Sequence, residues 1–160
     1  MIPTALDIAA LTVGASFGAT TRHVISQHAT KSQAFGALHI AKINIIGSLL
    51  LGTLAGVNKG ATMLPPPAVV PSAVPKFSLI QSLPNPRLTL LLGVGFCGSL
   101  TTFSTFSLDM IKLLEAAEYT TCLRYFALNN VGGAAAAGIG YFGAMKLLKR
   151  YGAAIASKKV

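Results

Sequence analysis

The sequence predicts an all-helical membrane protein with four transmembrane helices, and three observations lead to this fold class. Of the 160 residues, 52% are hydrophobic and only 11% are charged, whereas a soluble domain carries roughly 25% charged residues. The hydrophobic residues lie in four long runs, each long enough for the roughly 20 helical residues that cross a bilayer core of about 30 Å. The remaining sequence is too short for a soluble domain, so we expect one membrane domain over residues 1–160.

The four hydrophobic runs give the expected positions of the transmembrane helices: Ala5–Ile25, Gly36–Val57, Leu88–Leu114 and Tyr119–Leu148. The first run is not preceded by a basic segment, so we expect a retained helix rather than a signal peptide. Short connections at His28–Gln33 and Glu115–Tyr119 are expected to join helices one to two and three to four.

The connection between helices two and three is longer and rich in proline. Residues Lys59 to Arg87 contain seven prolines, each of which removes a backbone donor and opposes helix formation. We therefore expect an extended or disordered stretch at about 59–87 that acts as a passive linker. A basic tail is expected at about 149–160.

The net charge of +9 would indicate nucleic-acid binding in a soluble protein, but here the basic residues lie mostly at helix ends. We therefore expect anionic lipid headgroups of the bilayer, and not nucleic acid, as their partner. Eight cations fall on the side of the two termini and five on the other, which predicts both ends in the cytoplasm. The two sets are Lys59, Lys76, Arg87, Lys146, Lys149, Arg150, Lys158 and Lys159 against Arg22, Lys31, Lys42, Lys112 and Arg124.

Residues for catalysis or metal ligation are not grouped in this sequence. Cys97 and Cys122 are the only cysteines and have no metal-ligand spacing, so we expect them to pack as small apolar residues. The three histidines form no recognisable constellation with the four acids, which all lie near predicted helix ends. We therefore expect that the protein is not an enzyme.

The third helix contains the densest polar motif, residues 95–107, GFCGSLTTFSTFS. Glycine and hydroxyl residues in mid-membrane are typical of close helix packing. They are equally compatible with a helix break, which exposes carbonyl groups that protein, water or an ion must satisfy. The residues alone leave packing and an ion-related role open.

The motif GFCGSLTTFSTFS closely resembles the signature of the fluoride channel family known as Fluc or CrcB. Three further segments resemble that family in order and position: Gly14 to Gly18 followed by Arg22, Asn44 to Gly52 including Gly47, and Tyr125 followed by Gly132 to Gly140. The resemblance covers nearly the whole chain apart from the proline-rich loop and the tail.

The resemblance implies an antiparallel homodimer with two pores and a third helix broken in mid-membrane. It implies a structural Na+ ion at the dimer interface, held by the backbone carbonyls of Gly98 and Thr101. It further implies passive export of fluoride, which protects against fluoride toxicity, through the plasma (inner) membrane. An organelle membrane is the alternative location.

The fluoride pathway implied by the resemblance consists of neutral side chains. Amides and hydroxyls donate hydrogen bonds, and the positive edges of phenyl rings attract an anion weakly, so such residues replace hydration without trapping the ion. Residues 103 and 106 are three apart and share a helix face. The pathway residues are Asn44, Phe103, Ser104, Thr105, Phe106, Tyr125 and Asn129.

The chain departs from the family pattern at several positions. Asn129 stands where the family usually has serine, and an amide is larger but still donates. His39-Ile40-Ala41 replaces the usual Gly-Thr-Leu. Lys42 lies about 200° around the helix from Asn44, and therefore off the pore face.

Two other classes of membrane protein stay open on the residues. A small multidrug-type, proton-coupled cation exporter needs a carboxylate in the middle of a span, but Asp7 is the only acid in helix one and lies near its end. A scaffold without transport is the third class.

Overall fold

The computed structural model describes residues 3–31, 38–64 and 85–157, and all regular structure in these ranges is helical. The first two helices are α1 (Ala5–Lys31) and α2 (Leu38–Ala61). A third helical run follows, made of α4 (Pro86–Thr89), the π-helix η2 (Leu90–Cys97), α5 (Gly98–Leu100) and α6 (Phe103–Glu115). The fourth run is α7 (Tyr119–Ala127), the π-helix η3 (Leu128–Gly132) and α8 (Gly133–Ser157).

Three of these runs are long and apolar enough to cross a membrane, by length and composition: Leu38–Ala61, Pro86–Glu115 and Tyr119–Ala154. The 27 residues of α1 exceed the roughly 20 needed. However, α1 carries Asp7, Arg22 and two histidines among many hydroxyl residues, and it does not reach the same apolarity. The all-helical prediction is therefore confirmed for the described residues, with three apolar helices plus a more polar one.

The helices extend further than the sequence predicted. Helix α1 continues through most of the predicted loop at His28–Gln33 and ends at Lys31, and residues 32–37 lie outside the described ranges. Helix α8 continues through most of the predicted basic tail to Ser157. Backbone hydrogen bonds of a helix form whether or not a residue is apolar. The ends of the hydrophobic runs therefore underestimated the lengths of these helices.

The predicted extended loop at 59–87 is wrong at both ends. Helix α2 includes Lys59 and ends at Ala61, while Pro86 is the first residue of α4. Proline fits the first helical position because its missing N–H would have no partner there. Asn85 caps this helix, since its side chain accepts a hydrogen bond from the N–H of Arg87 at 2.9 Å. Residues 65–84 of the predicted loop lie outside the described ranges.

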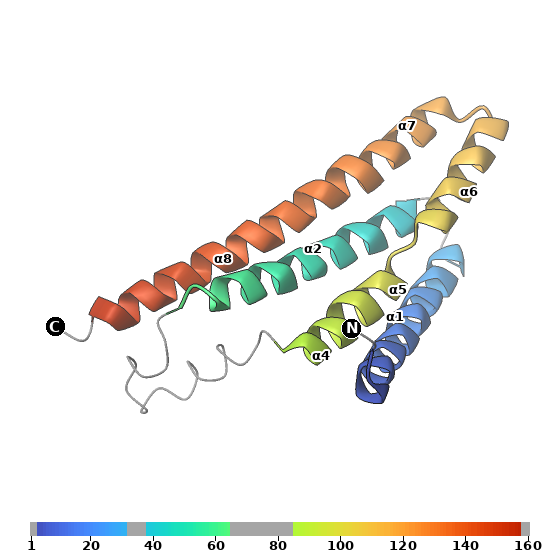
Figure 1. Ribbon diagram of the computed structural model, residues 1–160. Helices are drawn as coiled ribbons and strands as arrows, with labels where there is room; N and C mark the ends of the chain where they lie inside the picture. Colours follow the sequence, from blue (N-terminus) through green and yellow to red (C-terminus); the bar gives the residue numbers. More distant parts are fainter. Residues whose placement is uncertain (1–2, 32–37, 65–84, 158–160) are drawn as a thin grey trace.

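The helices pack as two pairs, α2 with η3 and α8, and α1 with η2 and α5 (Figure 1). Glycines permit this close approach. A Cβ atom at Gly52 or Gly56 of α2 would collide with the backbone of Ala137 or Tyr141 in α8. At Gly14 in α1 it would collide with the carbonyl of Leu91 in η2. The small residues in these helices therefore set the backbone spacing within each pair.

The buried core lies where α2, the end of α5, α6 and α7 meet. Tyr125 is completely buried there, and Cys122 packs in the same cluster. Cys97 is also buried, and both cysteines are free thiols, which agrees with the predicted packing role. The other members of the cluster are Ile40, Ala41, Ile43, Leu100, Phe106 and Leu113.

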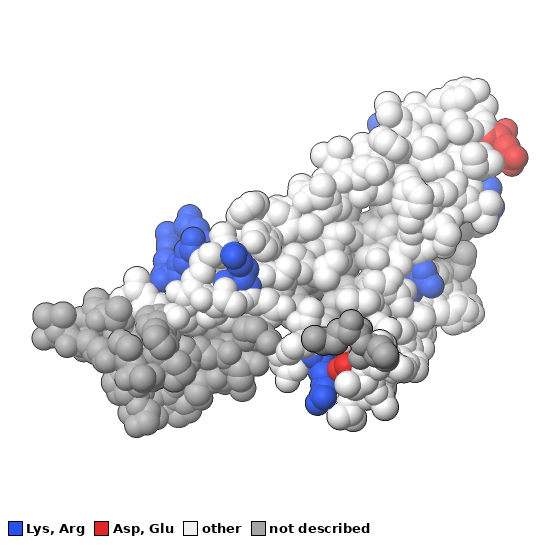
Figure 2. Space-filling view, viewed as in Figure 1, with Lys and Arg blue, Asp and Glu red and all other residues white. Residues whose placement is uncertain are grey.

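Charged side chains gather at the ends of the helices and leave the middle of the visible face without charge (Figure 2). Basic side chains lie over the C-terminal part of α8 and the adjoining end of α2, and acidic side chains lie where α6 turns into α7 (Figures 1 and 2). The turn between α6 and α7 is closed by the N–H of Glu118, which donates to the carbonyl of Leu113 at 2.9 Å. Ala117 adopts the left-handed conformation that this helix ending requires, with φ 56°.

Candidate ion pathway at the break in the third helix

The third helical run is interrupted at two adjacent threonines. Helix α5 ends at Leu100, and Thr101 and Thr102 are both extended, with φ −79°, ψ 155° and φ −150°, ψ 121°. Helix α6 then begins at Phe103. The side chain of Thr102 caps α6, since its Oγ1 accepts a hydrogen bond from the N–H of Thr105 at 3.3 Å. β-Branched residues favour extended backbone, and threonine is a good N-cap, so the Thr101-Thr102 pair suits a helix that stops and restarts.

The break redirects two backbone donors. In an uninterrupted α-helix the N–H of Thr102 would bond to the carbonyl of Gly98, and that of Thr105 to the carbonyl of Thr101. Here the N–H of Thr102 donates to Oδ1 of Asn44 at 2.9 Å, and the N–H of Thr105 donates to Oγ1 of Thr102. The carbonyls of Gly98 and Thr101 thereby lose their α-helical donors. These are the two carbonyls that the sequence resemblance assigns to a cation.

Asn44 links α2 to the break and to the fourth helix. Its Nδ2 donates to the carbonyl of Thr102 at 3.1 Å and to Oδ1 of Asn129 at 2.7 Å. Asn129 in η3 in turn donates from its Nδ2 to the carbonyl of Tyr125 at 2.9 Å. The sequence analysis expected Asn44 to give its donors to an anion. In this structure both donors meet protein oxygens, so an anion at Asn44 would replace one of them.

Two further hydroxyls of the predicted pathway meet at Thr102. Its Oγ1 lies 3.2 Å from Oγ of Ser104 and 3.1 Å from Oγ1 of Thr105. Thr102 itself is only 6% exposed. Thr102 was not among the predicted site residues, although its position beside Thr101 at the expected break was an available signal.

The two phenylalanines of the predicted pathway lie together but differ in environment. Their ring centroids are 5.6 Å apart, yet Phe103 is 75% exposed and Phe106 only 5%. The ring of Phe106 also packs 5.3 Å from that of Tyr125. The hydroxyl of Tyr125 donates to Asp109 Oδ2 at 3.1 Å. Asp109 was expected only as a helix-end acid, and its contact with Tyr125 became visible only in three dimensions.

A cavity of about 210 Å³ opens beside the break, and it collects residues from three helical runs. None of the described residues that line it is charged. Gly47 is placed where a Cβ atom would collide with the side chain of Thr101. The cavity therefore brings together part of the predicted pathway, and its lining includes Asn44, Gly47, Thr101, Phe103, Phe106 and Asn129.

The remaining motif residues lie elsewhere. Gly14 and Gly18 are contact points of α1 with η2 and α5, and Arg22 lies one turn beyond Gly18. None of these three lines the cavity at the break. Lys42 lines a separate cavity of about 710 Å³ between α1 and α2, which agrees with its predicted position away from the Asn44 face.

Comparison with known proteins gives a consistent family assignment. The family model described as CrcB-like protein, Camphor Resistance (CrcB), matches residues 9–141. A fluoride-specific ion channel FluC of Nautilia profundicola is 31% identical over 137 residues, covering 86% of this chain and 89% of that protein.

Two further relatives carry the name fluoride-specific ion channel FluC. The protein of Serratia proteamaculans is 30% identical over 126 residues, covering 79% of this chain and 84% of the relative. The protein of Gloeobacter violaceus is 43% identical over a shorter stretch of 63 residues, covering 39% of this chain and half of the relative. Because the family model covers most of the chain, including the helix break and the residues around it, this protein belongs to the CrcB family.

Proposed function

We propose that this protein is a fluoride-selective ion channel that lets fluoride leave a cell or compartment passively, and that it is not an enzyme. The observation that carries this proposal is the cavity at the helix break, whose described lining combines amides, hydroxyls and phenyl rings with Gly47 and Leu51 and includes no charged side chain. The amides and hydroxyls are neutral donors that can exchange their protein partners for a small anion that must shed its hydration. Family membership and the names of the relatives support the same function.

The proposed assembly is an antiparallel homodimer of four-span subunits with two pores. In this arrangement α1 is the remaining transmembrane helix and the break in the third helix lies in mid-membrane. Support comes from Gly98, which is exposed in the single chain and would meet only one atom, at 3.9 Å, if it carried a Cβ. A position this open beside a break is suited to contact with a second subunit. Fluoride, a second copy of the chain and the bilayer are the proposed partners.

The backbone oxygen atoms at this proposed interface are suitable ligands for a structural Na+ ion. The carbonyls of Gly98 and Thr101 have lost their α-helical donors, because Asn44 and the Thr102 hydroxyl take those N–H groups. Carbonyl oxygens are hard ligands suited to such a cation. If Na+ binds there, replacing all external sodium by a bulky organic cation will slow fluoride flux.

Purified protein in liposomes tests the channel proposal directly. Fluoride efflux driven by an electrical gradient is expected, with strong rejection of chloride, because the described residues that line the cavity include no cationic side chain that would bind any anion. Comparable fluxes of chloride and fluoride would contradict selectivity. Proton-driven dye efflux without fluoride flux would identify a cation exporter instead, and no transport at all would identify a scaffold. The plasma membrane is the proposed location.

A further inference from the structure

One side-chain amide satisfies both backbone groups of the residue at the break. The N–H of Thr102 donates to Asn44 Oδ1 at 2.9 Å, and Asn44 Nδ2 donates to the carbonyl of Thr102 at 3.1 Å. Where a helix ends inside a membrane, such groups lose their ladder partners and have no water to replace them. Asn44 therefore supplies at Thr102 the pairing that the helix would have supplied.

The amide of Asn44 fits this peptide in one orientation only. If the amide were turned over, its oxygen would face the carbonyl of Thr102 and its nitrogen would face the N–H, so that neither hydrogen bond would form. The second hydrogen of Asn44 Nδ2 is directed to Asn129 Oδ1 at 2.7 Å, the shortest of the three contacts. Asn129 thus anchors Asn44 from the side opposite the break.

Asn129 is itself held in the matching orientation. Its Nδ2 donates to the carbonyl of Tyr125, one turn earlier, at 2.9 Å, and this leaves Oδ1 to face Asn44. Tyr125 is completely buried among α2, α5 and α6. A continuous series of hydrogen bonds therefore runs from the core of the fourth helix through Asn129 and Asn44 to the peptide of Thr102.

We propose that Asn129 is a positioning residue for the fluoride pathway, an inference that rests on the function proposed above. By accepting a hydrogen bond from Asn44, Asn129 keeps that amide on the Thr102 peptide. Asn44 in turn keeps the N–H of Thr102 away from the carbonyl of Gly98, so the helix cannot close across the break. In this way Asn129 of the fourth helical run keeps the third run interrupted at Thr102, and it acts through Asn44 of α2.

Asn58 provides a control. It is also a partly buried asparagine whose Nδ2 donates to another helical run, to Thr89 Oγ1 at 3.0 Å. It does not line the cavity at the break. Comparing Asn129→Leu with Asn58→Leu therefore separates the contact with Asn44 from the loss of an interhelical asparagine contact in general.

The experiment combines two measurements on the full-length chain in liposomes. Hydrogen exchange of the Thr102 amide, followed by NMR on protein labelled with 15N-threonine, reports the hydrogen bond from Thr102 to Asn44. Fluoride efflux reports the pathway. For Asn129→Leu we expect Thr102 exchange about tenfold faster and fluoride efflux about tenfold slower, and for Asn58→Leu both within about twofold of the unaltered protein. Asn129→Ala removes the same contact without new bulk and is expected to behave as Asn129→Leu.

The outcomes distinguish a failure of the inference about Asn129 from a failure of the proposed channel function. If Asn129→Ala leaves both Thr102 exchange and fluoride flux unchanged, Asn129 positions nothing and the inference is wrong, while the channel function stands. Equal damage in the Asn129 and Asn58 variants would trace the effect to the loss of any interhelical asparagine contact and would also overturn the inference. If the unaltered protein carries no fluoride, the proposed function fails and this inference fails with it.

Discussion

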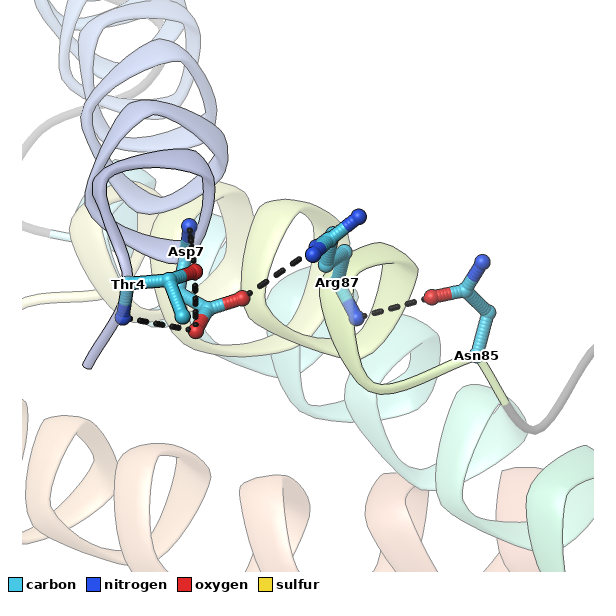
Figure 3. Close-up of polar contacts among 4 residues, drawn as sticks. All are labelled: Thr4, Asp7, Asn85 and Arg87. Atoms are coloured by element: carbon cyan, nitrogen blue, oxygen red, sulfur yellow. Dashed lines mark hydrogen bonds and ion pairs between the residues drawn. The ribbon is translucent and has the colours of Figure 1, made fainter. Parts of the chain in front are cut away.

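Among the polar contacts that join the third helical run to its neighbours, the set at its start and the set at its break differ in chemistry and in surroundings. At its start, Arg87 Nε lies 3.4 Å from Asp7 Oδ1, with 54% of the arginine and 25% of the aspartate side chain exposed (Figure 3). At its break, neutral amides and one peptide group meet at 2.7 to 3.1 Å around a threonine that is 6% exposed.

The difference shows where polar contacts matter in a membrane protein. An exposed ion pair exchanges contacts with water at little net gain, since solvent screens both charges. A buried peptide group inside the hydrocarbon layer has no such substitute, and leaving it unpaired costs several kcal/mol. Neutral groups at the break are therefore expected to determine function, whereas the charged pair only joins two helix ends. Four predictions, in decreasing order of effect, test this comparison.

The largest effect is expected for Asn44→Ala. This change removes three hydrogen bonds and leaves both backbone groups of Thr102 without their partner. Fluoride flux in liposomes should fall about a hundredfold, while the protein still dimerises in detergent. Asn58→Ala is the control, because Asn58 lies on the same helix but donates to Thr89 Oγ1, away from the break. Unchanged flux in Asn44→Ala would show that the break does not depend on this amide.

Gly98→Val is expected to weaken the proposed dimer without unfolding the single chain. In the isolated chain a Cβ at Gly98 has open space, with only the carbonyl of Gly93 within 4 Å, at 3.9 Å. The Cβ of the new side chain therefore meets no close neighbour within the described chain, and we expect the crowding to arise at the proposed contact with a second subunit. We expect the dimer dissociation constant in detergent to rise about tenfold or more. Gly143→Val, at another open and exposed position, is the control. A normal dimer in Gly98→Val would place the interface elsewhere.

The aromatic pair should separate pathway effects from packing effects. Phe103→Ile and Phe106→Ile both remove the positive ring edge, so each is expected to reduce fluoride flux severalfold. Only Phe106→Ile should also destabilise the fold, by roughly 1 kcal/mol, because its ring is buried against Tyr125 whereas Phe103 is 75% exposed. Flux and thermal unfolding measured on both variants check this, and full flux in both would reduce the pair to packing residues.

The smallest effect is expected for Asp7→Asn. The ion pair with Arg87 is lost, but an amide oxygen can still accept the hydrogen bonds that Thr4 gives to Asp7 from its N–H at 3.0 Å and its hydroxyl at 2.7 Å (Figure 3). We expect unchanged fluoride flux and an unfolding temperature within about 2 °C of the unaltered protein, with the difference shrinking further in high salt. A loss of fluoride flux comparable to that of Asn44→Ala would show that the charged pair matters as much for function as the neutral groups at the break.

Much of the fold was predictable from the sequence because each membrane helix depends on its own residues. A run of apolar residues long enough for the bilayer, and glycines at helix contacts, are local properties, and they place the helices with errors only at their ends. The effect of one proline was predicted wrongly. Pro86 begins a helix instead of preventing one, because Asn85 caps it and the first helical position requires no N–H.

The sequence motif at residues 95–107 predicted that the polar chemistry lies in the third helix, and the resemblance named six of the ten described residues that line the cavity at the break. The motif did not determine which groups pair with one another. That Asn44 bonds to the Thr102 peptide, that Asn129 bonds to Asn44, and that Asp109 meets Tyr125 are contacts between residues 16 to 85 positions apart. Only the packing of the second, third and fourth helical runs brings these groups within hydrogen-bonding distance, because the direction of a side-chain amide depends on every neighbour around it and not on its own place in the chain.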